Sequence, residues 1–234
     1  LASYTSLFPL RERDEDGAPA RNMEERAIEA WAEAAMPPPW EPPQVDTSDL
    51  PGFFRQRFSL PNEAVPHAIQ SLVVEIAEAV NVGLMFIETS TGGGKTEAAL
   101  AAAEVIAAQR GAQGILVALP TQATTNAMFA RVTDWLDHLP QRPNEDPAWA
   151  VTLGHSKASL NRRFAKMSEA VRNFDHVFNT ARSSGVYEED ADGVLCNAVV
   201  HQWFLSTKRR MLANFAVVTI AQKLMAGLQR NHLK

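Results

Sequence analysis

The chain has little cysteine and no excess of positive charge. Cys196 is the single cysteine among 234 residues, which excludes an intramolecular disulfide and a cysteine-based zinc site. This usage is typical of a reducing compartment, and we expect a cytoplasmic protein. Lysine and arginine number 22 against 27 aspartates and glutamates, so the net charge of −5 gives no global attraction to nucleic acid. Any contact with DNA must therefore come from local groups.

Long apolar runs and signal segments are also missing. No apolar stretch approaches the ~20 residues that a membrane helix needs, so no membrane association is expected. The N-terminus lacks the basic and apolar segments of a secretory signal. The chain begins at Leu1 rather than Met, and we expect that it was cut from a longer protein. The histidines show no metal-ligand spacing; they are His67, His138, His155, His176, His201 and His232.

Two parts are predicted along the chain. Residues 1–45 form an N-terminal extension, with a helix over Met23–Met36 that Asn22 caps and a stiff proline-rich connector over 37–43. Nothing before the connector could form a core alone, so we interpret the extension as the tail of another domain. Residues 46–234 are predicted to form one α/β domain.

The apolar pattern of the second part predicts a parallel sheet. Short, continuous apolar runs are typical of strands buried on both faces, and helical segments separate them. The predicted strands are Leu84–Ile87, Ile115–Leu119 and Ala216–Ile220, with a weaker one at Ala150–Leu153. The predicted helices are one of about 15 residues ending near Val80, Lys95–Gln109 and Gln122–His138, and a loop carries Phe53, Phe54 and Phe58. This order favours an open, mostly parallel sheet flanked by helices.

The segment Glu88–Glu97 reads Glu-Thr-Ser-Thr-Gly-Gly-Gly-Lys-Thr-Glu, between a predicted strand and a predicted helix. This is a phosphate-binding loop, although Thr89 stands where the general pattern has its first glycine. The glycines allow several amide N–H groups to converge on one phosphate. Lys95 would reach the β- and γ-phosphates, and the Thr96 hydroxyl would bind Mg²⁺ beside the helix N-terminus. The predicted nucleotide-binding residues of this loop are Thr91, Gly92, Gly93, Gly94, Lys95, Thr96 and Glu97.

The string that follows the second predicted strand, Ala118–Phe129, reads Ala-Leu-Pro-Thr-Gln-Ala-Thr-Thr-Asn-Ala-Met-Phe. Together with Thr91–Leu100, it resembles the superfamily 2 helicase region of the CRISPR-associated helicase–nuclease of type I systems. Residues 66–70, 153–158 and 207–222 fit the same family, so the resemblance covers about residues 50–234. It implies a RecA-like P-loop NTPase lobe, a preceding nuclease domain, ATP and Mg²⁺ as cofactors, and single-stranded DNA and the Cascade surveillance complex as partners. We expect a monomer.

The resemblance also implies roles for single residues. Gln70 resembles the glutamine that reads the adenine edge, since a carboxamide donates and accepts at once; a plain helix-surface residue is the alternative. One of the three phenylalanines would stack on the base, with core positions expected for at least two of them. The predicted DNA contacts are Pro120, Thr121, Thr124, Asn126, Arg131, His155, Thr219 and Gln222.

These DNA contacts are predicted because hydroxyl and carboxamide groups at strand ends suit a sugar-phosphate backbone without sequence preference. Each has a plainer alternative: Thr121 caps a helix, Arg131 forms a surface ion pair, and His155 is a loop residue. The sequence departs from the family at Ala221, where Asp is usual. An Asp there would cap a helix beginning around Gln222, and its loss would cost about 1 kcal/mol.

No Asp-Glu-x-His box occurs within residues 1–234, and that box would hold Mg²⁺ and polarise the attacking water. The chain is therefore expected to bind nucleotide without complete catalytic residues, as the ATP-binding part of a helicase whose full-length form translocates on DNA and degrades invading DNA. Two alternatives stay open. One is a stand-alone nucleotide-binding or adaptor module, and the other is a different P-loop enzyme such as a small-molecule kinase.

Overall fold

The computed structural model describes residues 22–33, 37, 39–79, 83–140, 149–168, 198–200, 204 and 209–228. The chain divides into two compact units, Leu1–Pro38 and Pro39–Lys234. In the first unit, helix α1 spans Met23–Glu33, and Asn22 caps it as predicted. The Asn22 side chain accepts a bond from the Glu25 amide at 2.8 Å, and Glu25 accepts from the Asn22 amide at 3.1 Å. Residues 1–21 of the predicted extension lie outside the described part.

The second unit begins before residue 45, because Trp40 belongs to its core. The Trp40 ring is fully buried and lies 5.0 Å from the Phe215 ring and 6.4 Å from the Trp135 ring, both edge-on. The tryptophan in the middle of the proline-rich connector is thus packed against the sheet of the second unit.

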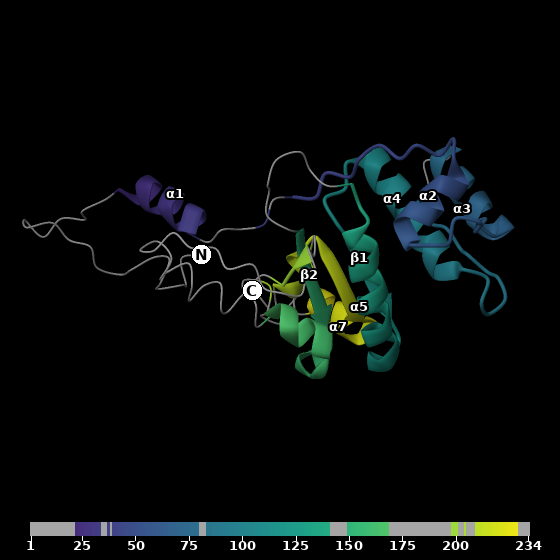
Figure 1. Ribbon diagram of the computed structural model, residues 1–234. Helices are drawn as coiled ribbons and strands as arrows, with labels where there is room; N and C mark the ends of the chain where they lie inside the picture. Colours follow the sequence, from purple (N-terminus) through teal and green to yellow (C-terminus); the bar gives the residue numbers. More distant parts are fainter. Residues whose placement is uncertain are drawn as a thin grey trace, which may run out of the picture. The chain divides into compact units, whose positions relative to one another are not determined.

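A parallel sheet forms the centre of the second unit, with four strands among the described residues (Figure 1). The strands are β1 (Ile115–Leu119), β2 (Trp149–Gly154), β3 (Ala198–Val199) and β4 (Phe215–Thr219), in the order β1-β4-β2-β3. Every pairing is parallel. All five residues of β4 are buried, as expected for a central strand with both faces covered. The predicted parallel sheet is confirmed.

Helices flank the strands along the chain, and the crossover from β1 to β2 is helical, as parallel strands require. Helix α4 spans Lys95–Arg110 and ends at Gly111 in the left-handed conformation; α5 spans Gln122–Asp137, and α7 spans Ile220–Leu228. Short 3-10 turns occur at Ala158–Leu160 and Arg210–Leu212, and residues 162–168 are helical. None of the described helices combines the length and apolarity needed to cross a membrane.

Helices α2 (Leu50–Phe58), α3 (Ala68–Ala79) and α4 form a group beside the sheet (Figure 1). The predicted loop around the phenylalanines is therefore wrong: they lie on α2, which Asp49 caps by accepting from the Gly52 amide at 2.9 Å. Pro51 in the first turn is the helix-start signal that the interpretation missed. Phe53 and Phe54 are buried in the helical group and Phe58 packs against it, so the core reading holds.

The predicted strand Leu84–Ile87 is also wrong. These residues are extended but pair with no strand in the described part of the chain. Met85 and Ile87 pack against the α2–α4 group, whereas Leu84 and Phe86 are exposed. An apolar run predicts burial, and here helices bury one face of the segment without giving it a hydrogen-bonded neighbour.

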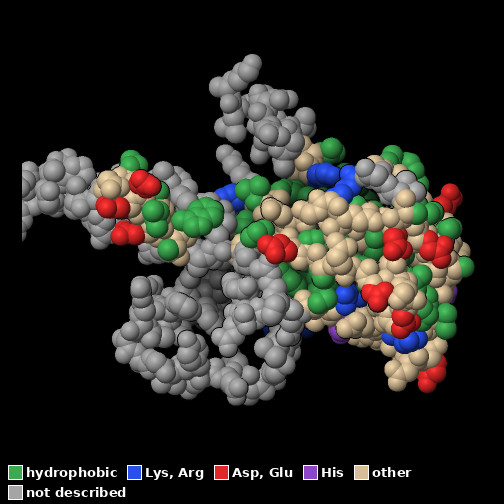
Figure 2. All heavy atoms as spheres, turned by 90° about the horizontal axis from the view of Figure 1, so that it is seen from above, with side chains coloured by type: hydrophobic (Ala, Val, Ile, Leu, Met, Phe, Trp, Pro, Cys, Tyr) green, Lys and Arg blue, Asp and Glu red, His purple; other side chains and the backbone are tan. Residues whose placement is uncertain are grey.

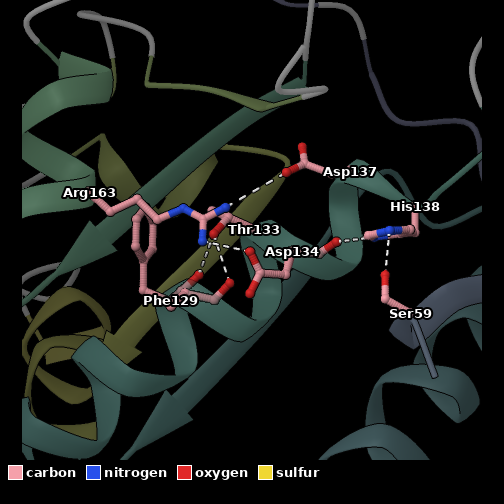
Figure 3. Close-up of polar contacts among 8 residues, drawn as sticks. Ser59, Phe129, Thr133, Asp134, Asp137, His138 and Arg163 are labelled. Carbon is pink, nitrogen blue, oxygen red and sulfur yellow. Dashed lines mark hydrogen bonds and ion pairs between the residues drawn. The ribbon is translucent and has the colours of Figure 1, made fainter. Parts of the chain in front are cut away.

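Polar bonds fix α5 and α4 to their surroundings. Near the end of α5, Arg163 pairs with Asp134 at 2.6 Å and Asp137 at 3.7 Å, and His138 contacts Ser59 at 2.6 Å (Figure 3). In the interior, Arg57 on α2 donates through Nε to both carboxylate oxygens of Glu104 on α4 at 3.1 Å. Burial raises the pKa of Glu104, and the Arg57 charge acts in the opposite direction.

Candidate functional site

The predicted phosphate loop is a tight turn between the extended segment and α4. Gly92 and Gly94 have φ values of 85° and 71°, a region that glycine adopts readily and other residues rarely enter. At Gly93 a side chain would press on Thr89 and on the Ser90 carbonyl. The Gly93 amide bonds that carbonyl at 3.2 Å, which closes the turn. The glycine triplet is thus needed for the shape of the loop.

The start of α4 presents unpaired donors to this turn. Gly94 caps the helix without a side-chain bond, and its carbonyl accepts from the Ala98 amide. Among the described residues no acceptor outside the helix is found for the amides of Lys95, Thr96 or Glu97. These are first-turn N–H groups that a helix cannot satisfy itself. An anion would satisfy them, and the dipole of the 16-residue helix adds to the attraction.

Lys95 lies over the loop with its ammonium group at the rim. Its Nζ donates to the carbonyl oxygens of Thr89 at 2.5 Å and Ser90 at 2.8 Å. The side chain is exposed, so Nζ can exchange these carbonyls for a phosphate oxygen by rotation of its stem.

A cleft of about 400 Å³ opens at the loop. It is lined by residues 91–97 together with His67 and Arg131. Its size lies in the range of small-ligand sites. Its donors are amides and cations suited to phosphates, and the Thr96 hydroxyl is an oxygen ligand of the kind that Mg²⁺ takes. The residues present therefore fit a nucleotide phosphate chain with its metal ion.

Gln70 lies beneath the loop rather than on a surface. It is 4% exposed, which excludes the helix-surface alternative. Its Oε1 accepts from the His67 amide at 2.8 Å, and its Nε2 donates to the Gly94 carbonyl at 3.2 Å. In this arrangement Gln70 ties α3 to the loop. Adenine reading by Gln70 stays a prediction.

Most of the predicted DNA contacts come together at the carboxyl edge of the sheet. Because the strands are parallel, their C-terminal ends share one edge. Pro120 and Thr121 follow β1, His155 follows β2, and Thr219 ends β4. A bond of 2.9 Å from Gln122 Nε2 to Ser156 Oγ joins the segments after β1 and β2.

Thr121 and Thr124 form a capping box at the start of α5. The Thr124 amide donates to Thr121 Oγ1 at 3.2 Å, and the two hydroxyls are 2.9 Å apart. The predicted cap at Thr121 is confirmed. Both side chains are nevertheless exposed, so capping and a contact with a backbone phosphate are compatible.

Asn126 and His155 are bonded to each other within this edge. His155 is 3% exposed, and its Nδ1 accepts from the Lys157 amide at 3.2 Å. Its Nε2 must then carry the proton, which it donates to Asn126 Oδ1 at 2.9 Å. Asn161 Nδ2 donates to the same oxygen at 3.0 Å. Asn126 Oδ1 is thus saturated, and its Nδ2 has no partner among the described residues.

One predicted contact lies elsewhere, and two at or just after the end of β4 are buried or half-buried. Arg131 does not join the sheet edge but contacts the phosphate loop. Thr219 is buried, and Gln222 is half-buried in the first turn of α7. Helix α7 begins at Ile220, so Ala221 lies inside the helix and the expected capping position for Asp is wrong.

Asn161 is a site residue that sequence reasoning missed. Its Oδ1 accepts from the Phe164 amide at 3.0 Å, which caps the helical residues 162–168. The pattern of Asn three residues before an apolar residue is a helix-start signal and could have indicated this. Its second bond, to Asn126, depends on tertiary packing and cannot be predicted from the local sequence.

Comparison with known proteins gives relatives of one kind. A protein named CRISPR-associated nuclease/helicase Cas3 from Streptococcus thermophilus is 29% identical over 235 residues, which covers 100% of this chain and 23% of that protein. A CRISPR-associated endonuclease/helicase Cas3 from Thermus thermophilus is 36% identical over 168 residues, which covers 71% of this chain and 16% of that protein. No family model matches the chain.

Solved structures agree with these relatives. A crystal structure of T. fusca Cas3-ATP has a TM-score of 0.55 and 26% identity, and it covers 86% of this chain and 18% of that one. A second T. fusca Cas3 structure, at 24% identity, supports the fold alone, with a TM-score of 0.60 over 96% of this chain and 21% of that one. The chain is similar to one segment of Cas3 proteins. It spans less than a quarter of the Cas3 relatives that it matches. The predicted α/β, RecA-like fold is confirmed.

Proposed function

We propose that the chain is the ATP-binding part of an ATP-dependent DNA helicase or translocase of type I CRISPR interference. The observation that carries this proposal is the phosphate loop: left-handed Gly94 leads into first-turn amides without acceptors, and Lys95 lies above them. The similarity to a Cas3-ATP structure supports adenine nucleotide as the ligand.

Each loop residue would contact a different part of the nucleotide or its metal ion. The amides of Lys95, Thr96 and Glu97 would hold phosphate oxygens, and Lys95 Nζ would move from the Thr89 and Ser90 carbonyls to the terminal phosphates. Thr96 would hold Mg²⁺, which when bound would neutralise phosphate charge. Gln70 would keep the Gly94 carbonyl turned away from the anion through its 3.2 Å bond.

The carboxyl edge of the sheet would bind single-stranded DNA by its backbone. The exposed Thr121 hydroxyl and Asn126 Nδ2 are donors that suit phosphate oxygens, and they carry no sequence preference. Thr124 would join them by exchanging the bond that its hydroxyl donates to the Thr121 carbonyl at 3.0 Å. Acidic and basic side chains are interspersed on the face shown in Figure 2. The net charge is −5, so affinity for DNA would rest on these local donors rather than on overall positive charge. Pro120, Thr219 and Gln222 would line the same edge.

The complete motor would need more than this segment. Residues 1–234 contain no Asp-Glu-x-His box, so the chain alone is proposed to bind nucleotide without turning it over. Translocation, degradation of DNA and recruitment by Cascade are proposed for the full-length protein.

Thermal unfolding and DNA binding together test this proposal. A ligand that binds only the folded chain raises the melting temperature with concentration. ATP with Mg²⁺ should therefore raise the melting temperature of the wild type, and at the same concentration raise that of Lys95→Ala less. Labelled single strands of unrelated sequence should bind with similar affinity. The assignment would be contradicted if ATP leaves the melting temperature of the wild type unchanged, or if the chain binds only one of the DNA sequences.

A further inference from the structure

Arg131 connects α5 to the first turn of α4 at the rim of the nucleotide cleft. Its Nη1 donates to Thr96 Oγ1 at 2.9 Å, and its Nη2 pairs with Glu97 Oε1 at 2.9 Å. The Arg131 side chain is 55% exposed and that of Glu97 is 21% exposed, and both residues line the cleft. The two arms of one guanidinium thus bridge adjacent residues of the helix start.

The Thr96 contact conflicts with metal binding. A Mg²⁺ ion takes its oxygen ligands at about 2.0–2.1 Å, so it would lie close to any cation that bonds the same oxygen. A guanidinium nitrogen 2.9 Å from Thr96 Oγ1 places a second positive charge beside that position. A divalent and a monovalent cation repel each other at such separation, and the half-exposed setting of Arg131 screens this repulsion only in part. Thr96 Oγ1 can therefore serve Arg131 or the metal ion, but not both.

We propose that Arg131 occupies the metal position of the cleft when no nucleotide is bound, and that Mg²⁺ must displace it from Thr96. This inference rests on the nucleotide-binding function proposed above. In the absence of the metal, Arg131 keeps the Thr96 hydroxyl bonded and its charge neutralises Glu97. When Mg²⁺ arrives with the nucleotide, it replaces the Arg131 guanidinium at Thr96. Mg²⁺ therefore competes with Arg131 for this position.

The exchange also reaches the DNA edge. Arg131 belongs to α5, the helix whose N-terminal turns carry Thr121, Thr124 and Asn126. Its two bonds tie α5 to α4 across 34 and 35 residues of sequence. Displacement by Mg²⁺ therefore releases one polar tie between the nucleotide helix and the helix of the proposed DNA contacts.

A Mg²⁺ titration of nucleotide binding tests the competition directly. The full 234-residue chain would be mixed with a fluorescent ATP analogue, and binding would be followed by anisotropy from a chelator-treated sample up to saturating Mg²⁺. Removing the competitor in Arg131→Ala should lower the half-saturating Mg²⁺ concentration about fivefold, the scale of one partly exposed charge-assisted bond. In this proposal Arg131 contacts Thr96 and Glu97 rather than a phosphate, so the affinity for metal-free nucleotide should change by less than about twofold.

Two further variants make the test specific. Arg163→Ala removes another arginine that pairs with α5, at Asp134 and Asp137 away from the cleft, and should leave the Mg²⁺ midpoint unchanged (Figure 3). Arg131→Lys keeps the charge but cannot bridge Thr96 and Glu97 together, so its midpoint should lie between those of wild type and Arg131→Ala. Arg131→Lys also serves if Arg131→Ala fails to fold.

The outcomes separate this inference from the proposed function. If wild type binds nucleotide and the midpoint is unchanged or raised in both Arg131 variants, the competition is refuted while nucleotide binding stands. If Arg131→Ala loses metal-free nucleotide affinity severalfold, Arg131 is a phosphate ligand and the inference is wrong. If wild type binds no nucleotide at any Mg²⁺ concentration, the proposed function and the inference both fail.

Discussion

Gln70 and Gly94 are joined across the base of the phosphate loop: Gln70 Nε2 donates to the Gly94 carbonyl at 3.2 Å. Gly94 has a φ of 71°, and a Cβ on it would collide with Gln70 Nε2. The glutamine thus fills the space that a side chain at position 94 would need. The shape of the loop depends on both residues.

Gly94→Ala should therefore abolish measurable nucleotide binding and destabilise the second unit. The backbone conformation alone costs about 1–2 kcal/mol for a residue with Cβ, and the collision adds to it. Gly111→Ala is the matched control, because Gly111 is also left-handed, with a φ of 59°, but has open space around a Cβ. Denaturant unfolding and nucleotide titration of both variants would check this. Equal losses in the two variants would show that Gln70 packing is irrelevant.

Asn126→Asp should weaken binding of single-stranded DNA about tenfold or more, since the donor is lost and a like charge faces the phosphates. The substitution keeps Oδ1 as the acceptor for His155 and Asn161, so the local structure should persist. Gln113→Glu adds the same charge just before β1, near the opposite edge of the sheet, and should have little effect. Fluorescence anisotropy with a labelled oligonucleotide would measure the DNA affinity of the wild type and of both variants. Similar losses for both variants would indicate only a general charge effect.

His155 should make the stability of the second unit depend on pH. Burial lowers the pKa of His155 below its ordinary value of 6.5, and the Arg210 charge acts in the same direction. The unfolded chain then binds a proton more readily than the folded one, so the free energy of unfolding falls as pH drops through 6.5 and below. His155→Gln keeps a donor for Asn126 but does not titrate. Its free energy of unfolding, relative to that of the wild type, should therefore increase toward acid pH. If the free energy of unfolding has the same pH dependence in the wild type and in His155→Gln, this role of His155 is refuted.

Trp40→Ala should lower the free energy of unfolding of the second unit by about 3–5 kcal/mol, because a fully buried indole leaves a large cavity. Trp31 on α1 is exposed, and Trp31→Ala should change stability by less than about 0.5 kcal/mol. Urea unfolding monitored by circular dichroism compares the two. A small effect at Trp40 would place the boundary of the folded unit after it, near the predicted residue 45.

Local signals made much of this molecule predictable. The strand Ile115–Leu119 and the start of α5 at Gln122 follow from an apolar run, a proline and a threonine cap, all within a few residues. The glycine triplet and Lys95 indicated the phosphate loop for the same reason, since one turn of backbone determines it. The parallel sheet then placed Thr121 and His155 at one edge.

Contacts between distant elements were not predictable from local patterns. Arg131 reaches Thr96 over 35 residues because of how α5 lies against α4, and the sequence interpretation offered a DNA contact or a surface ion pair without naming a partner. Leu84–Ile87 has the composition of a buried strand, but helices cover one of its faces and its backbone finds no neighbour among the described strands. In both cases tertiary packing decided the outcome.

Equilibrium binding of a fluorescent adenine nucleotide with Mg²⁺ to wild type and Lys95→Ala tests the central claim most directly. Loss of the Lys95 ammonium group removes a charge-assisted phosphate contact, so affinity should fall about tenfold or more. Lys166→Ala removes an exposed lysine that does not line the cleft and should bind as wild type does. Equal affinity of wild type and Lys95→Ala would contradict the assignment of this loop to nucleotide.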